Sequence, residues 1–279
     1  MNETVLYAFA VTVLLASGGL AALCVFGSAR VPFWLDRGVF ALGLITAGVS
    51  LYSTLFQVDG MHFGFAVGLM CVVWVAAVVA FVEGFVDRVP FLEMFIFPLC
   101  AAVFLLELMV GEESHVPMAM DWLFQAHLLI AISAYSLLGL AAVHSIVMAY
   151  QEKMLHQPLR MGREGQAKRE RMLDHLPSLI SMESILFRQL WAGFVLLSLT
   201  LVSGFLFSEQ WSGHAFRFDH KTLFSVVSWV SFAVLLGGRL LLGWRGKVAL
   251  RWCLGSYVML FLAYFGTQFV LEFILKRAV

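Results

Sequence analysis

Histidines are the residues of this chain whose type and position could do chemistry. Five of the eight fall at or near the ends of long apolar stretches, all on one side if those stretches alternate in direction: His62, His115, His127, His214 and His220. A neutral imidazole can ligate iron and tolerates the edge of a membrane better than a permanent charge does. Each of the five, taken singly, is also explained as an interfacial hydrogen-bonding residue. Their common side indicates an imidazole-rich site.

His127 differs from the others because it lies within an apolar stretch, "DWLFQAHLLIAISAYSLLGLAAVHS", about 9 Å along a helix from Asp121. Helical spacing places small residues on or beside its face: Ala131, Ala134 and Ala141. Such residues admit either a flat ligand or a second helix, and both interpretations stay open. His144, about 25 Å further along and on a different face, is predicted to make a polar contact between helices.

The composition identifies the elements that must hold these histidines. Of 279 residues, 61% are hydrophobic and 13% charged, whereas soluble domains have about a quarter charged residues. The chain is therefore predicted to be a polytopic membrane protein. A net charge of zero gives no support for a nucleic-acid partner. Four cysteines lie in apolar stretches without a CxxC pair, which indicates packing and neither zinc nor redox chemistry: Cys24, Cys71, Cys100 and Cys253.

Eight apolar stretches are long enough to cross about 30 Å of hydrocarbon as helices. They lie near 5–26, 38–58, 62–82, 91–110, 122–150, 189–207, 222–242 and 252–271. The start, "MNETVLYAF", lacks the basic region of a signal peptide, so the first stretch is expected to be retained. Only helices satisfy their own backbone in lipid at such lengths. The sequence therefore predicts an all-α bundle of eight transmembrane helices in a single integral membrane domain, 1–279.

Basic residues predict the orientation of this bundle. Fourteen lysines and arginines fall in or beside the connections after the odd-numbered stretches, and four fall on the opposite side: Arg217, Lys221, Lys276 and Arg277. Both termini are therefore predicted to be on the outer, periplasmic side of a bacterial inner membrane. The connection 151–188 is predicted to be a solvated cytoplasmic loop, with docking of a cytoplasmic partner as the alternative. Its last part, "LPSLISMESILF", is predicted to lie along the inner membrane surface.

The chain from Trp122 onward resembles the cytochrome c assembly family of integral membrane proteins, the CcsA/HemX type, and most closely its short YpjD-like branch. The stretches that show the resemblance are "HLLIAISAYSLLGLAAVHSI", "LPSLISMES", "FDHKTLFSVVSWVSFAVLLGGR", "GWRGKVALRW" and "LAYFGTQFVLE". The earlier stretches match only as hydrophobic helices. The resemblance implies the eight-helix fold and a role in handling haem.

The same resemblance implies particular site residues. His127 matches the helix histidine that is an axial haem ligand in haem-handling members. The tryptophan-rich outer motif that runs into W-D-P-K-E corresponds to "WSGHAFRFDHKT": Trp211, Asp219 and Lys221 agree, Phe218 replaces a tryptophan and His220 replaces the proline. A later helix histidine is replaced by Gly238, and the final outer histidine has no counterpart. The resemblance therefore implies either an eroded haem platform or one rebuilt with His220 or His214 as the second axial ligand.

The stretch "FRFDHKTLFSVVSWV" has a structural and a functional interpretation. Structurally, Asp219 is suited to cap the helix that follows, and Lys221 extends its ammonium group outward. Functionally, His220 faces His127 while Arg217 and Lys221 pair with haem propionates.

We therefore expect a haem-binding or haem-trafficking inner-membrane protein, not an enzyme, linked to cytochrome c assembly or tetrapyrrole metabolism. Its cofactor is expected to be non-covalent haem b, with His127 and His220 on the iron. Its expected partners are the lipid bilayer and cytochrome c maturation or other inner-membrane proteins. The alternative is a haem-free scaffold or regulatory subunit. A transporter is disfavoured because the intramembrane acids, Glu93, Glu107 and Glu272, lie near the ends of the stretches.

Overall fold

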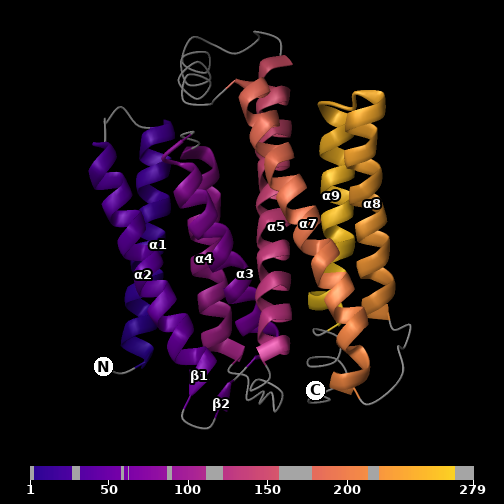
Figure 1. Cartoon of the computed structure of the whole chain (residues 1–279). Helices are drawn as coiled ribbons and strands as arrows, with labels where there is room; N and C mark the ends of the chain where they lie inside the picture. Colours follow the sequence, from indigo (N-terminus) through magenta and orange to yellow (C-terminus); the bar gives the residue numbers. More distant parts are fainter. Residues whose placement is uncertain are drawn as a thin grey trace.

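The protein is an up-and-down bundle of long helices (Figure 1). A computed structural model describes residues 3–26, 32–57, 60–61, 63–86, 90–110, 122–156, 178–212 and 220–267. The helices are α1 Glu3–Phe26, α2 Phe33–Leu55, α3 Phe65–Glu83, α4 Pro90–Val110, α5 Trp122–His156, α7 Leu179–Ser212, α8 His220–Leu242 and α9 Lys247–Phe261, which continues into the π-helical turn η2 Leu262–Gly266. Between α2 and α3 lie two antiparallel strands of two residues each, β1 Phe56–Gln57 and β2 Gly60–Met61.

Eight of these helical segments are long and apolar enough to cross a membrane, counting α9 with η2. The predicted all-α fold with eight membrane-spanning helices is therefore confirmed. The start of α1 and the end of η2 lie at one end of the bundle, here called the terminal end (Figure 1, bottom). The end of α5 and the start of α7 lie at the other, here called the loop end.

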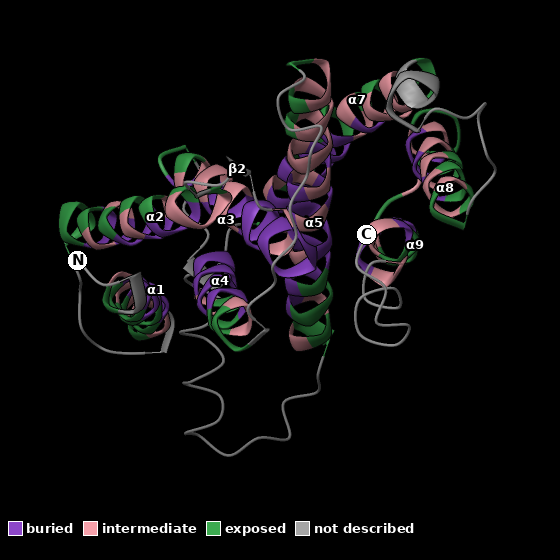
Figure 2. Cartoon of the chain, turned by 90° about the horizontal axis from the view of Figure 1, so that it is seen from below, coloured by how far each residue is buried: buried purple, intermediate pink, exposed green. Residues whose placement is uncertain are grey.

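α5 lies between two groups of helices (Figures 1 and 2). α1 to α4 pack on one side of it, and α7, α8 and α9 lie on the other, with α3, α7 and α9 in direct contact with α5. Buried residues concentrate on the helices around this centre, notably α3, α4 and α5 (Figure 2). α5 is 35 residues long, about 52 Å at the rise of an α-helix, so it exceeds the hydrocarbon thickness, as the sequence predicts.

The sixth helix begins earlier in the chain than the sequence predicts. α7 is one continuous helix from Leu179, whereas the sequence suggests a surface segment before a span that begins at residue 189. Met182, Ile185 and Leu186 are buried in the bundle, and Glu183 pairs with Arg239 of α8. The apolar face of this segment thus finds protein partners, and the segment continues the helix of the sixth span.

A buried ion pair connects α2 to α4 at the loop end. Arg37 Nη2 lies 2.6 Å from Glu93 Oε1, and both side chains are almost fully buried. Arg37 Nη1 also donates to the carbonyl oxygen of Phe81, 3.3 Å away. Four rings lie 5.4–5.7 Å from the guanidinium carbon: Phe33, Phe40, Phe81 and Phe85. Cation–π contacts and the carboxylate together replace the water that a buried guanidinium lacks.

Removing one partner of this pair should destabilise the protein more than removing both. Glu93→Gln leaves a buried guanidinium without its counter-charge, so we expect a loss of about 3 kcal/mol in the free energy of unfolding. The double variant Arg37→Met/Glu93→Leu should lose less, because no buried charge remains. Unfolding of the purified protein in detergent measures both, and a double variant weaker than Glu93→Gln would contradict the interpretation.

The distribution of basic residues predicts that the loop end is cytoplasmic. A reporter that is active only in the cytoplasm should be active when fused after Arg169 and silent when fused after Gly213, because the positive-inside rule retains basic connections in the cytoplasm. Enzyme activity of the two fusions in intact cells measures this. The reverse pattern would place the terminal end inside the cell.

Candidate functional site

The candidate site depends on a close antiparallel contact between α5 and α7. Buried residues follow one another on α5 at spacings of four and three: Ala134, Leu138, Ala141, Ser145 and Met148. This spacing is typical of left-handed helix packing. A Cβ added to Gly193 of α7 would lie 2.6 Å from Leu138 Cδ2, so only glycine admits the leucine there. We call this contact the α5–α7 seam.

The seam brings both helix histidines against α7. His127 Nδ1 lies 2.7 Å from Ser203 Oγ, and His144 Nδ1 lies 3.0 Å from Gln189 Oε1. The sequence predicts different faces for the two rings, because 17 residues in a straight helix leave them roughly 100° apart. With the 3.5-residue period of a left-handed seam, 17 residues make almost five turns, so both rings reach the same neighbour. The prediction of different faces was therefore wrong.

His127 is half-buried at the terminal end of the seam. A Cβ added to Gly204 would lie 3.3 Å from His127 Cε1, so glycine leaves the ring its space. Ser203 Oγ also donates to the carbonyl oxygen of Thr200, 3.1 Å away. The hydroxyl thus holds one ring nitrogen and fixes the orientation of the imidazole.

A cation and an aromatic ring lie at the same end. Lys221 Nζ, near the start of α8, is 4.9 Å from the centre of the Tyr264 ring in η2. Lys221 is also near enough to His127 to influence it electrostatically. α8 is positioned by two hydrogen bonds: Trp229 Nε1 donates to Ser198 Oγ of α7 at 2.8 Å, and Ser228 Oγ donates to the carbonyl oxygen of Ser256 of α9 at 2.9 Å.

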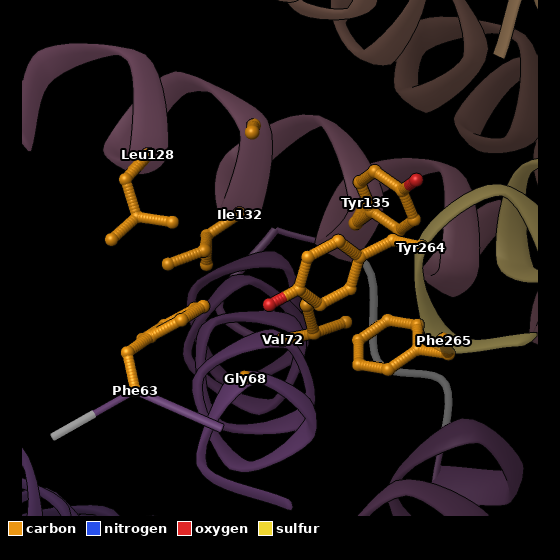
Figure 3. A pocket seen from close by; sticks show the side chains of 9 residues that line it. Phe63, Gly68, Val72, Leu128, Ile132, Tyr135, Tyr264 and Phe265 are labelled. Carbon is orange, nitrogen blue, oxygen red and sulfur yellow. The ribbon is translucent and has the colours of Figure 1, made fainter. Parts of the chain in front are cut away.

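A small apolar cavity of about 50 Å³ adjoins this group (Figure 3). Leu128, Ala131 and Ile132 of α5 line it together with Tyr135, and rings from outside α5 complete it: Phe63, Tyr264 and Phe265. Typical small-molecule pockets measure roughly 300 Å³ or more. The described residues thus fit haem in their chemistry, because an imidazole, a cation and aromatic rings lie together. The cavity itself is too small for a whole macrocycle and admits only its edge.

The three alanines predicted beside His127 have two different roles, one for each interpretation that the sequence leaves open: space for a ligand and close helix packing. Ala131 lines the cavity one helical turn from His127. Ala134 and Ala141 are fully buried within the bundle, as close helix packing requires.

Other predicted site residues are only partly placed. His220 is the first residue of α8 and is exposed. Its position does not place its ring against His127. Trp211 belongs to the last turn of α7, but its side chain lies outside the described part of the structure, as do the whole of His214, Arg217 and Asp219. The capping role predicted for Asp219 and the propionate role predicted for Arg217 stay predictions.

Gly238, where the resemblance implies a lost histidine, is filled by packing. A Cβ at this position would lie 2.4 Å from Trp244 Cε3. Trp244 also donates its backbone N–H to the carbonyl oxygen of Gly238, 3.1 Å away. The indole occupies the space beside the helix that a side chain at residue 238 would need.

The loop end of the seam holds a polar network that the sequence did not reveal. Besides His144, Gln189 contacts Glu83 of α3, to whose Oε2 its Nε2 donates at 2.7 Å. Arg188 lies 3.8 Å from Glu83 Oε1. His144, predicted as a polar contact between helices, is confirmed in that role and is fully buried. The sequence offers one indication of this network: Gln189 follows Arg188 at the predicted start of the sixth span, so α7 could carry polar side chains at this end.

Fold and geometry define a polytopic helical membrane protein with an oriented imidazole at its terminal end. Residues 38–275 match the cytochrome c assembly protein family, and the chain belongs to that family. Membership and the eight apolar helices make it a multi-pass inner-membrane protein.

Individual relatives match the chain over shorter stretches. It is 33% identical over 150 residues to an uncharacterized 28.8 kDa protein in the nifR3-like 5′ region of Azospirillum brasilense, covering 53% of this chain and 52% of the relative. It is 29% identical over 150 residues to the inner membrane protein YpjD of Escherichia coli K12, with the same coverage. It is 28% identical over 87 residues to the cytochrome c biogenesis protein CcsA of Prochlorococcus marinus NATL1A, covering 31% and 28%. The match thus spans about half the length of the first two relatives. No solved structure matches the chain.

The hydrogen bonds at the two ends of the seam should differ in energy. Gln189→Leu removes the partner of a fully buried imidazole, so we expect it to lower the free energy of unfolding by roughly 1–2 kcal/mol. Ser203→Ala should cost less, because the half-buried His127 can find water. Unfolding in detergent compares them, and equal losses would show that burial does not determine the cost.

Proposed function

We propose that this protein binds haem at its terminal end during cytochrome c biogenesis, with His127 as an axial ligand of the iron. Membership of the cytochrome c assembly family supports a role in that process, and so does the likeness to a relative named a cytochrome c biogenesis protein. The observation that carries the haem assignment is the orientation of His127 by Ser203 beside Gly204.

The hydrogen bond to Ser203 determines which atom would meet iron. It engages Nδ1, so coordination is assigned to Nε2. Metal-ligating histidines commonly use their second nitrogen for such a bond, which fixes the ring and tunes its basicity. Gly204 leaves space for the ring in this orientation, because a Cβ there would lie 3.3 Å from His127 Cε1.

Lys221 and the aromatic rings support the rest of the assignment. The ammonium group of Lys221 lies 4.9 Å from the centre of the Tyr264 ring. This cation would pair with a propionate group of the haem. Haem, when bound, supplies an iron centre whose coordination and potential depend on its axial ligands. The residues of this chain then bind it, orient it and shield it, and no bond of a substrate is broken. With the terminal end outward, the haem would meet maturation partners on the outer side of the membrane.

The test is the absorbance spectrum of protein purified from cells supplied with haem. The wild type should show a Soret band at a stoichiometry near one haem per chain. His127→Ala should lower haem occupancy sharply or convert a low-spin spectrum to a high-spin one, because an axial ligand is lost.

His144→Ala is the matched control, since His144 also lies on α5 and also contacts α7. It should leave the spectrum unchanged although it loosens the same seam. His220→Ala tests the second ligand, and a loss equal to that of His127→Ala would assign it. A wild-type protein without Soret absorbance would contradict the proposal and favour the haem-free scaffold.

A further inference from the structure

A second and larger apolar cavity opens on the side of the bundle, far from either end of α5. Its volume is about 380 Å³, and α3, α4, α5 and α9 all contribute to its lining. Val72, Ser136 and Leu140 at its floor are buried or nearly so, whereas Leu99, Ile146 and Val258 at its rim are 48%, 55% and 54% exposed. We call it the lateral crevice. Its exposed rim shows that it opens sideways, toward the hydrocarbon of a membrane.

The lining of the lateral crevice offers little to a polar ligand. Ser136 Oγ donates to the carbonyl oxygen of Ile132 at 2.6 Å and to that of Val72 at 2.9 Å. The hydroxyl is thus satisfied by the helices themselves, and the remaining lining is almost wholly aliphatic and aromatic carbon. Such a surface favours a hydrocarbon chain as its occupant.

Two exposed cations lie above this crevice, toward the loop end. Lys153 follows the rim residue Ile146 by seven residues on α5, and Arg251 precedes the rim residue Val258 by seven on α9. Seven residues are two helical turns, about 10 Å, so each cation lies on the face of its rim residue. Tyr150, on the same face of α5, is 45% exposed between Ile146 and Lys153.

These two cations differ from the other basic residues at the loop end. Five of those lie against carboxylates: Arg37, Arg188, Arg239, Arg245 and Lys247. Within the part of the chain that the structure describes, Lys153 and Arg251 have no such acidic partner. Two cations without an acidic partner among the described residues, on two of the four helices that line one crevice, point to an anion between them.

We propose that an anionic phospholipid binds here, with its phosphate held by Lys153 and Arg251 and one acyl chain in the lateral crevice. The distance agrees, because one leaflet provides about 15 Å of hydrocarbon and the rim begins about 10 Å below the cations. Basic pockets between transmembrane helices are known to bind anionic headgroups. Tyr150 and Trp252 are partly exposed near the two cations, at the level that interfacial aromatic residues favour. This site is independent of haem.

The test is native mass spectrometry of the purified chain in detergent with added phosphatidylglycerol or phosphatidylcholine. The wild type should retain one phosphatidylglycerol in preference to phosphatidylcholine. Lys153→Gln/Arg251→Gln should weaken that preference by roughly 25-fold, since each cation near a headgroup adds about a fivefold preference. The matched control Arg245→Gln/Lys247→Gln removes two exposed cations at the same end that are paired with acids. It should leave the preference unchanged.

The acyl-chain part has its own variants. Ala142→Phe, from α5, and Ala76→Phe, from α3, fill the crevice and should reduce retention of both lipids alike. Ala192→Phe, exposed on α7, is the control for added bulk, and gel filtration shows which variants stay folded. The proposal is overturned if the wild type shows no preference, if both double variants lose it equally, or if neither crevice variant changes retention. Retention of a porphyrin or a prenyl lipid in place of phospholipid would also overturn it.

Discussion

The close contact between α5 and α7 determines where the polar groups of the candidate site lie. Inside a membrane, lipid tails are as apolar as leucine, so helices associate through tight packing and hydrogen bonds. Gly193 supplies the tight packing by admitting Leu138 at the middle of the seam. His127–Ser203 and His144–Gln189 supply hydrogen bonds on either side of it. A slip of one residue along the seam would break both bonds and drive a larger side chain against Leu138.

Side chains of the two seam helices also form hydrogen bonds with other helices of the bundle. At the loop end, Gln189 continues from His144 to Glu83 of α3, so one amide joins three helices. At mid-height, Ser136 connects α5 to the backbone of α3. On the other side, Trp229 of α8 bonds to Ser198 of α7 and stacks on Phe194, with ring centres 5.5 Å apart. α8, which carries Lys221, is therefore positioned by its contacts with α7. His127 is held by the same helix, so α7 positions both the cation and the imidazole of the site.

Sequence patterns predicted the local features well. Hydropathy over about twenty residues suffices for the eight spans, and helical spacing suffices to place Ala131 beside His127. Features that depend on distant partners were missed. Gln189 bonds to residues 45 and 106 positions away in the chain, and no local pattern marks such pairs. The buried position of Arg37 was missed for the same reason. A basic residue next to a span normally marks a solvated connection, whereas here the carboxylate of Glu93 and four rings from α2, α3 and the turn after α3 allow its burial.

The turn between α8 and α9 fills the space beside Gly238. Gly243 and Gly246 have φ values of +66° and +56°, which glycine adopts without steric cost. These two residues turn the chain so that Trp244 lies over Gly238, and Trp244 stacks on Trp252 of α9 with ring centres 5.6 Å apart. A histidine at residue 238 would therefore have to displace an indole that connects two helices. The space at this level is thus filled by packing, whereas at the opposite end of the bundle Gly204 leaves space for the ring of His127.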